Sequence, residues 1–138
     1  MSNYSKLFDL TGRVAVVTGG AGLLGEEFCK ILATAGAQVV VADIDANAAK
    51  DLSHTLSELH AKEKRSVNME VEPAVISSWI DVTDLDAVQS TVDTTLNQFG
   101  RLDILVNSAA MDPKFDPQHS GGHTNAFEGY PKEAWNKA

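Results

Sequence analysis

A glycine-rich turn between an apolar strand and a helix is the feature that most constrains this chain. Residues 14–18 read Val-Ala-Val-Val-Thr, and Gly19, Gly22 and Gly25 follow at intervals of three. Gly19 allows a tight turn after the strand, Gly22 lets a pyrophosphate approach the backbone, and Gly25 lets the helix start lie against the strand. The turn therefore predicts a dinucleotide-binding site, with the unpaired N–H groups of the helix start facing the phosphates.

Strand and helix patterns alternate after this turn. We expect strands at 14–18, 38–43, 74–80 and 102–107, and helices at 23–36, 45–65 and 83–99, the last capped by Thr83 and closed by Gly100. This alternation builds an α/β fold with right-handed crossovers. It predicts a doubly wound parallel sheet with strand order 3-2-1-4 and helices on both faces, which is part of a Rossmann fold.

Apolar residues recur at helical spacing in all three helices. They are Leu24, Phe28, Ile31 and Ala35 in the first helix, Ala49, Leu52, Leu56 and Leu59 in the second, and Leu85, Val88, Val92, Leu96 and Phe99 in the third. We expect the second and third sets to face the interior. The single cysteine, Cys29, falls in the first helix and is interpreted as a small buried side chain. A lone cysteine favours a reducing, cytoplasmic location.

The fourth strand marks the end of the regular pattern. It would lie at the open edge of the sheet, although its residues are too apolar for an edge that faces solvent. Periodicity is lost after Ala110, and Pro131 begins a helix pattern that stops at Ala138. We therefore expect residues 1–110 to be the cofactor-binding portion and residues 111–138 an active-site-side loop and the start of the next helix. The catalytic half of the fold is expected to be absent.

Polar residues follow three other strands at the edge where ligands of such sheets bind. Asp43 can accept hydrogen bonds from both hydroxyls of an adenine ribose, whereas Asp45 suits the role of a helix cap. No Lys or Arg lies in the glycine turn or directly after Asp43, which favours NAD over NADP. Asp81 can accept from the exocyclic amine of adenine, although a helix start explains it almost as well. Asn107 can hydrogen-bond neighbouring backbone, and small residues after it leave room for a ribose.

These features together resemble the short-chain dehydrogenase/reductase family. The matches are Thr18-Gly19 for its Thr-Gly turn, Asp43 for its acidic residue, Asp81-Val82 for its Asp-Val pair, and Asn107-Ser108-Ala109 for its Asn-x-Ala-Gly signature, with Ala110 in place of glycine. Leu23 stands where the common short form has its middle glycine, so the glycine spacing resembles the epimerase-type members. A weaker resemblance points to members in bacterial surface-sugar and flagellin-glycan pathways.

The resemblance implies a cofactor site and a reaction class. The expected cofactor-binding residues are Gly19, Ala21, Gly22, Leu23, Leu24, Gly25, Asp43, Ile44, Asp81, Val82, Asn107, Ser108 and Ala109. The family transfers a hydride with a nicotinamide cofactor and uses a Tyr-x-x-x-Lys pair as acid/base. The chain has no such pair, because Phe8 follows Tyr4 and Ala134 follows Tyr130 at that spacing.

We therefore expect an NAD-dependent oxidoreductase acting on an alcohol/ketone pair, with sugar-derived substrates included, represented by its cofactor-binding half. On its own this half is expected to be inactive. Two alternatives stay open: a stand-alone dinucleotide-binding module without chemistry, and an epimerase/dehydratase-type member.

Charge and composition exclude several kinds of partner. The net charge of −8 argues against nucleic acid and against an anionic membrane surface. No signal peptide and no segment able to span a bilayer is recognised. His119 and His123 flank a Ser-Gly-Gly run and are interpreted as loop histidines, so no metal site is expected. The expected partners are a small-molecule substrate and, for a full-length family member, further copies of itself.

Overall fold

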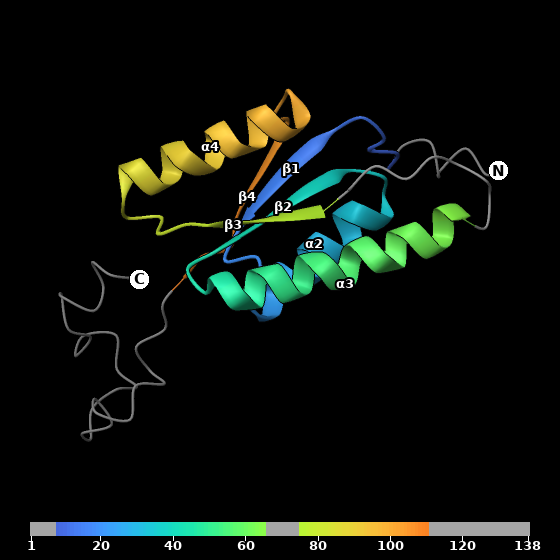
Figure 1. Cartoon of the computed structure of the whole chain (residues 1–138), viewed down its shortest axis with the longest axis horizontal. Helices are drawn as coiled ribbons and strands as arrows, with labels where there is room; N and C mark the ends of the chain where they lie inside the picture. The colour runs from blue at the N-terminus through green and yellow to red at the C-terminus, as the bar shows by residue number, and fades with distance from the viewer. Residues whose placement is uncertain (1–7, 66–74, 111–138) are drawn as a thin grey trace, which may run out of the picture.

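The chain folds around one parallel sheet in a computed structural model that describes residues 8–65 and 75–110. The elements are β1 (Val14–Thr18), α2 (Leu23–Thr34), β2 (Gln38–Asp43), α3 (Ala46–Arg65), β3 (Val75–Trp79), α4 (Leu85–Phe99) and β4 (Ile104–Asn107). The sheet has four parallel strands in the order β3-β2-β1-β4. Helices α2 and α3 lie on one face and α4 on the other (Figure 1). The predicted fold and strand order are confirmed.

The middle of the sheet is buried from both sides. All five residues of β1 and the four inner residues of β2 are buried. Successive strand residues point to opposite faces, so Val17, Val39 and Val41 pack with α2 and α3, while Val16 and Val40 pack on the α4 side. Continuous apolar runs are typical of parallel strands that helices cover on both faces.

The ends of two helices follow the glycines. Gly36, with φ of 96°, comes directly after the C-cap residue of α2, and Gly100, with φ of 76°, closes α4 as predicted. The predicted N-cap of α4 is wrong, however. Asp84 caps this helix, because its carboxylate accepts from the N–H of Asp86. Thr83 instead donates its N–H and hydroxyl to Asp81.

The buried side of α4 also differs from the prediction. Its buried residues are Ala87, Thr91 and Thr95, whereas Leu85 is 83% exposed and Leu96 is also exposed. Small side chains allow the helix to lie close to the sheet. Their hydroxyls are satisfied there, because Thr91 bonds to the Trp79 carbonyl and the Ser78 hydroxyl, and Thr95 donates to the Thr91 carbonyl. From the predicted set, Val88 and Phe99 are partly buried and pack against the core.

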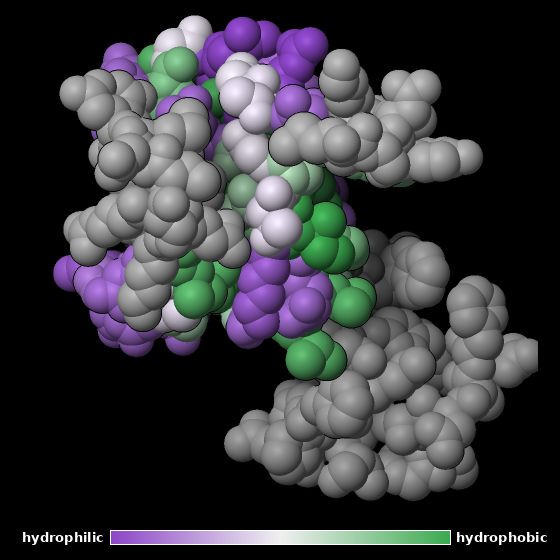
Figure 2. All heavy atoms as spheres, turned by 90° about the vertical axis from the view of Figure 1, so that its right-hand side faces the viewer, coloured by the Kyte–Doolittle hydropathy of each residue, from purple (hydrophilic) through white to green (hydrophobic). Residues whose placement is uncertain are grey.

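Of the other two helices, only α3 buries part of its predicted apolar set. In α3, Ala49 and Leu56 are buried, Leu52 is partly buried and Leu59 is exposed. In α2, the buried residues are Gly25, Cys29 and Ala33, while Leu24, Phe28 and Ile31 are exposed. Hydrophobic residues therefore also lie at the surface, where Figure 2 shows them beside hydrophilic ones. None of the helices within the described ranges has the length and apolar character to cross a membrane.

Cys29 is fully buried, as predicted. Burial, with the nearby Glu26 carboxylate as a smaller cause, raises the pKa of its thiol to about 12. The thiolate is the reactive form of cysteine, so this side chain is a packing residue rather than a nucleophile.

Strand β4 lies at the edge of the sheet and is fixed at its start. Asp103 precedes it, and its carboxylate accepts the N–H of Val14 at 2.9 Å and bonds to the guanidinium groups of Arg13 and Arg101. Within the strand, Leu105 is 57% exposed. The start of β4 is thus fastened to β1, while its outer surface is open in the part of the chain that the structure describes.

Candidate functional site

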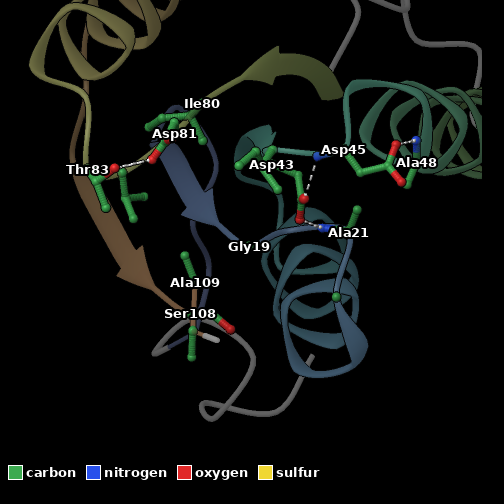
Figure 3. A pocket seen from close by; sticks show the side chains of 14 residues that line it. Gly19, Ala21, Asp43, Asp45, Ala48, Ile80, Asp81, Thr83, Ser108 and Ala109 are labelled. Atoms are coloured by element: carbon green, nitrogen blue, oxygen red, sulfur yellow. Dashed lines mark hydrogen bonds between the residues drawn. The ribbon is translucent and has the colours of Figure 1, made fainter. Parts of the chain in front are cut away.

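A pocket of about 390 Å³ opens at the carboxyl ends of the four strands. Its lining comes from the loop after β1 (Gly19, Ala21, Gly22), the segment after β2 (Asp43, Ile44, Asp45, Ala48), the loop after β3 (Ile80, Asp81, Val82, Thr83) and the segment after β4 (Ser108, Ala109, Ala110). Figure 3 shows Asp43 and Ala21 on one side of this space and Ile80, Asp81 and Thr83 on another. Parallel strands bring these loops to one edge, which is where ligands of such sheets bind.

The glycine turn has no room for side chains. Gly19 adopts φ of 62°, and a Cβ on it would lie 2.7 Å from the Cα of Ala109. A Cβ on Gly25 would overlap the carbonyl oxygen of Gly19. Gly25 therefore packs its helix against the turn, not against the strand as expected. Gly20, which the sequence analysis did not single out, is also restricted, since its Cβ would lie 2.9 Å from the Val17 carbonyl oxygen.

The start of α2 lacks a side-chain cap. Gly22 is the N-cap residue and has no side chain to accept from the first-turn N–H groups. Those N–H groups have no partner within the helix, and the positive end of the helix dipole adds to their attraction for an anion. Leu23 and Leu24 start this turn with exposed side chains outside the pocket lining. Their predicted part in binding would therefore come from their backbone.

Asp43 is joined by hydrogen bonds to three neighbouring segments. Its Oδ2 accepts the N–H of Ala21 at 3.0 Å, and its Oδ1 accepts the N–H of Asp45 at 2.9 Å. Its backbone carbonyl accepts the N–H of Ile80 at 3.1 Å. Both side-chain bonds are drawn in Figure 3. Asp45 has the capping role predicted for it, because its Oδ1 accepts the N–H groups at the start of α3.

Asp81 and two apolar side chains form another part of the lining. The Oδ1 of Asp81 accepts from the Thr83 hydroxyl at 2.7 Å and from its N–H at 2.9 Å. These bonds, the hydroxyl first, hold the pKa of Asp81 below its usual value, so the group is a carboxylate at neutral pH. Ile44 is 65% exposed and Val82 48% exposed, and both line the pocket. Such surfaces suit a flat apolar ring beside a hydrogen-bond acceptor.

Thr18 positions the segment after β4. This buried residue accepts, through its Oγ1, the N–H of Ser108 at 3.2 Å and of Ala109 at 3.4 Å. Thr18 was predicted only as part of a motif, and nothing in its spacing indicated this contact. Asn107 has an exposed side chain outside the pocket lining, and its predicted hydrogen bonds to neighbouring backbone stay a prediction.

Most of the predicted site residues come together in the pocket. The exceptions are Leu23, Leu24, Gly25 and Asn107, which do not line it. The lining also includes Asp45, Ala48, Ile80, Thr83 and Ala110, which were not predicted. Ile80 and Ala110 could have been found from their positions next to residues already chosen. Ala48 could not, because only the geometry of the α3 start brings it there.

The charge of the pocket is carried by carboxylates. Asp43, Asp45 and Asp81 line it, and the described residues that form its lining include no Lys, Arg or His. Within residues 8–65 and 75–110, no group of three or more His, Cys, Asp or Glu side chains is arranged to hold a metal ion. His119 and His123 lie outside the described residues.

The sequence is similar to known proteins of one family. The family model for short chain dehydrogenase matches residues 13–138. A short chain dehydrogenase/reductase of Colletotrichum higginsianum is 42% identical over 108 residues, which are 78% of this chain and 36% of that relative. Fluoren-9-ol dehydrogenase of Terrabacter is 35% identical over 122 residues, 87% of this chain and 30% of that relative. The chain thus spans less than half the length of these curated relatives.

A solved structure has a similar fold over most of this chain. It is 3-ketoacyl-(acyl-carrier-protein) reductase from Brucella melitensis complexed with NADH, with a TM-score of 0.57 and 28% identity. The match covers 70% of this chain and 33% of that one.

Proposed function

Because the chain belongs to the short chain dehydrogenase family, we propose that its pocket binds NAD for an oxidoreductase that interconverts an alcohol and a ketone. The observation that carries the choice of NAD is a pocket lined by three carboxylates, those of Asp43, Asp45 and Asp81, and, within residues 8–65 and 75–110, by no basic side chain. A 2′-phosphate on the adenine ribose would be repelled by these carboxylates. NADP sites instead place an Arg nearby to accommodate that phosphate.

The described residues fit such a cofactor. Gly19 and Gly22 line the pocket without side chains of their own, and the uncapped start of α2 offers N–H groups for the pyrophosphate. Asp43 would accept from the ribose hydroxyls and Asp81 from the adenine amine, with Ile44 and Val82 against the ring. Ser108 and Ala109, the small residues after Asn107, would lie beside the second ribose.

The cofactor, when bound, supplies the hydride acceptor of the reaction. The described residues bind and orient it, and none of them is a tyrosine. We therefore propose that a residue outside the described ranges transfers the proton. The choice of substrate is a property of the whole protein.

Calorimetric titration of the chain with NAD and NADP tests the proposal. We expect NAD to bind at least about tenfold more tightly, and Asp43→Ala to weaken NAD by about 1–3 kcal/mol, the cost of unpaired buried hydrogen-bonding groups. Equal or tighter binding of NADP by the unmutated chain would overturn the choice of cofactor. Failure to bind either dinucleotide would overturn the site itself.

A further inference from the structure

The residue that would bind the ribose also holds the turn that would bind the phosphates. The Oδ2 of Asp43 accepts the N–H of Ala21, which directly precedes the N-cap of α2, Gly22. Backbone bonds also hold the turn: the N–H of Gly20 donates to the Ala42 carbonyl, the N–H of Gly22 to the Gly19 carbonyl, and the N–H of Glu26 to the Gly22 carbonyl. Three glycines and one alanine make up this turn. Glycine backbone is intrinsically free, so these hydrogen bonds add to the packing of Ala21 against the core and to the close backbone contacts of Gly19 and Gly20 in fixing its conformation.

We propose that Asp43 is a positioning residue that couples the ribose and pyrophosphate parts of the site. Its carboxylate holds Ala21, and with it the start of α2, in the conformation that receives the phosphates. This inference rests on the proposed function. It adds that loss of the carboxylate weakens phosphate binding as well as ribose binding.

The carboxylate has the capacity for both tasks. Two carboxylate oxygens can accept about four hydrogen bonds, and the N–H groups of Ala21 and Asp45 account for two of them. The remaining positions can accept both ribose hydroxyls without releasing the turn. A bound ribose and an ordered turn are therefore compatible with one side chain.

Electrostatics alone predicts the opposite effect of a mutation. Asp43 is negative and lies in the same pocket as the glycine turn, so removing its charge should strengthen the binding of an anionic phosphate. Loss of the bond to Ala21 should instead weaken it. The two explanations differ in sign, which makes them separable.

The test compares adenosine with ADP, because the pair differs only in the phosphates. We define the phosphate contribution as the ratio of the adenosine Kd to the ADP Kd, both measured by NMR titration of the chain. Asp43→Ala should lower this ratio about tenfold, as expected for one lost charge-assisted hydrogen bond. Asp43→Asn, which keeps one acceptor oxygen, should lower it by a smaller factor.

Asp81→Asn is the matched control. It makes the same change of charge and shape in the same pocket, but Asp81 bonds to Thr83 and not to the glycine turn. In this variant the ratio of the adenosine Kd to the ADP Kd should stay within about twofold of the unmutated value or rise. In the same spectra, amide exchange at Ala21 should become faster in the Asp43 variants while β1 and β2 stay protected. If Asp43→Ala fails to fold, Asp43→Asn decides the test.

The outcomes separate this inference from the proposed function. A lower ratio in the Asp43 variants alone supports the coupling. If these variants weaken adenosine and ADP by the same factor, or raise the ratio as Asp81→Asn can, the coupling is wrong while the nucleotide site stands. If the unmutated chain binds neither ADP nor NAD, both are wrong.

Discussion

Strands β2 and β4 have similarly apolar sequences but very different surroundings. Strand β2 lies between β1 and β3 with helices over both faces, and its four inner residues are buried. In β4, residues alternate between partly buried and exposed, and the strand pairs with β1 at the edge of the described sheet. An apolar run therefore predicts a strand whose side chains need other elements packed over them. The cover itself depends on the elements on both sides of the strand.

A charge in β2 should have the largest effect. Val40 is fully buried, and an isolated charge there costs several kcal/mol even after partial relaxation. Since a domain is stable by only about 5–15 kcal/mol, Val40→Asp should unfold the chain, as measured by far-UV circular dichroism. Leu105→Asp is the control in β4 and should leave the spectrum unchanged. A folded Val40→Asp chain would contradict the difference between the two strands.

Removing the Thr18 hydroxyl should have the next largest effect, because it holds the carboxyl end of β4. Thr18→Val keeps the shape but removes the hydroxyl acceptor of the Ala109 N–H and leaves the Ser108 N–H with only the Thr18 backbone carbonyl. We expect a loss of about 1–3 kcal/mol in the free energy of unfolding, measured with urea. Thr18→Ser should retain most of the stability. A larger loss for Thr18→Ser than for Thr18→Val would show that the methyl group matters more than the hydroxyl.

The Asp103 cluster should make the attachment of β4 sensitive to acid. Bonds from Arg101 first, and then from the Val14 N–H, hold the pKa of Asp103 well below its usual range. A carboxylate with a lowered folded-state pKa stabilises the fold above its unfolded pKa of about 3.9, and this stabilisation is lost as the pH falls towards the folded value. Asp103→Asn should therefore flatten the decline of the urea midpoint between about pH 5 and pH 2. An unchanged decline would assign the acid sensitivity to other carboxylates.

The smallest change in stability should come from the exposed surface of β4. An open apolar edge favours pairing with another chain, so we expect the chain to self-associate through β4. Leu105→Lys should reduce this association in light scattering while changing the free energy of unfolding by no more than about 0.5 kcal/mol. Leu85→Lys is the control, because Leu85 is as apolar and even more exposed but lies on α4. An equal reduction by both variants would point to net charge instead of the edge.

The sequence predicted the sheet because the order of elements leaves few topologies. Apolar runs at β1 and β2, separated by helical patterns, allow a parallel sheet with right-handed crossovers. The loops after the strands could then be assigned to one edge, which located Asp43, Asp81 and Ser108 in the pocket. Alternation along the chain was sufficient for this level of detail.

The orientation of the helices could not be predicted in the same way. Large apolar residues such as Leu85 were expected inside, but Thr91 and Thr95 are buried instead. The Thr91 hydroxyl donates to the Trp79 carbonyl at the end of β3, and the Thr95 hydroxyl donates to the Thr91 carbonyl within α4. The bond from Asp43 to Ala21 was also invisible, since it depends on which N–H group the turn brings within reach. Periodicity reports spacing, whereas these contacts depend on three-dimensional fit.

The uncapped start of α2 has a thermodynamic consequence. A helix whose N-cap is glycine has no side-chain acceptor at its first turn, which costs only about a few tenths of a kcal/mol relative to Ser, Thr, Asn or Asp but leaves the first N–H groups without a side-chain cap. An anion bound at this end would accept hydrogen bonds from the first N–H groups of the helix, so its binding would stabilise the folded state. A ligand that binds only the folded state adds about 2.7 kcal/mol when its free concentration is a hundred times its Kd. The melting temperature of the chain should accordingly rise with the concentration of free dinucleotide.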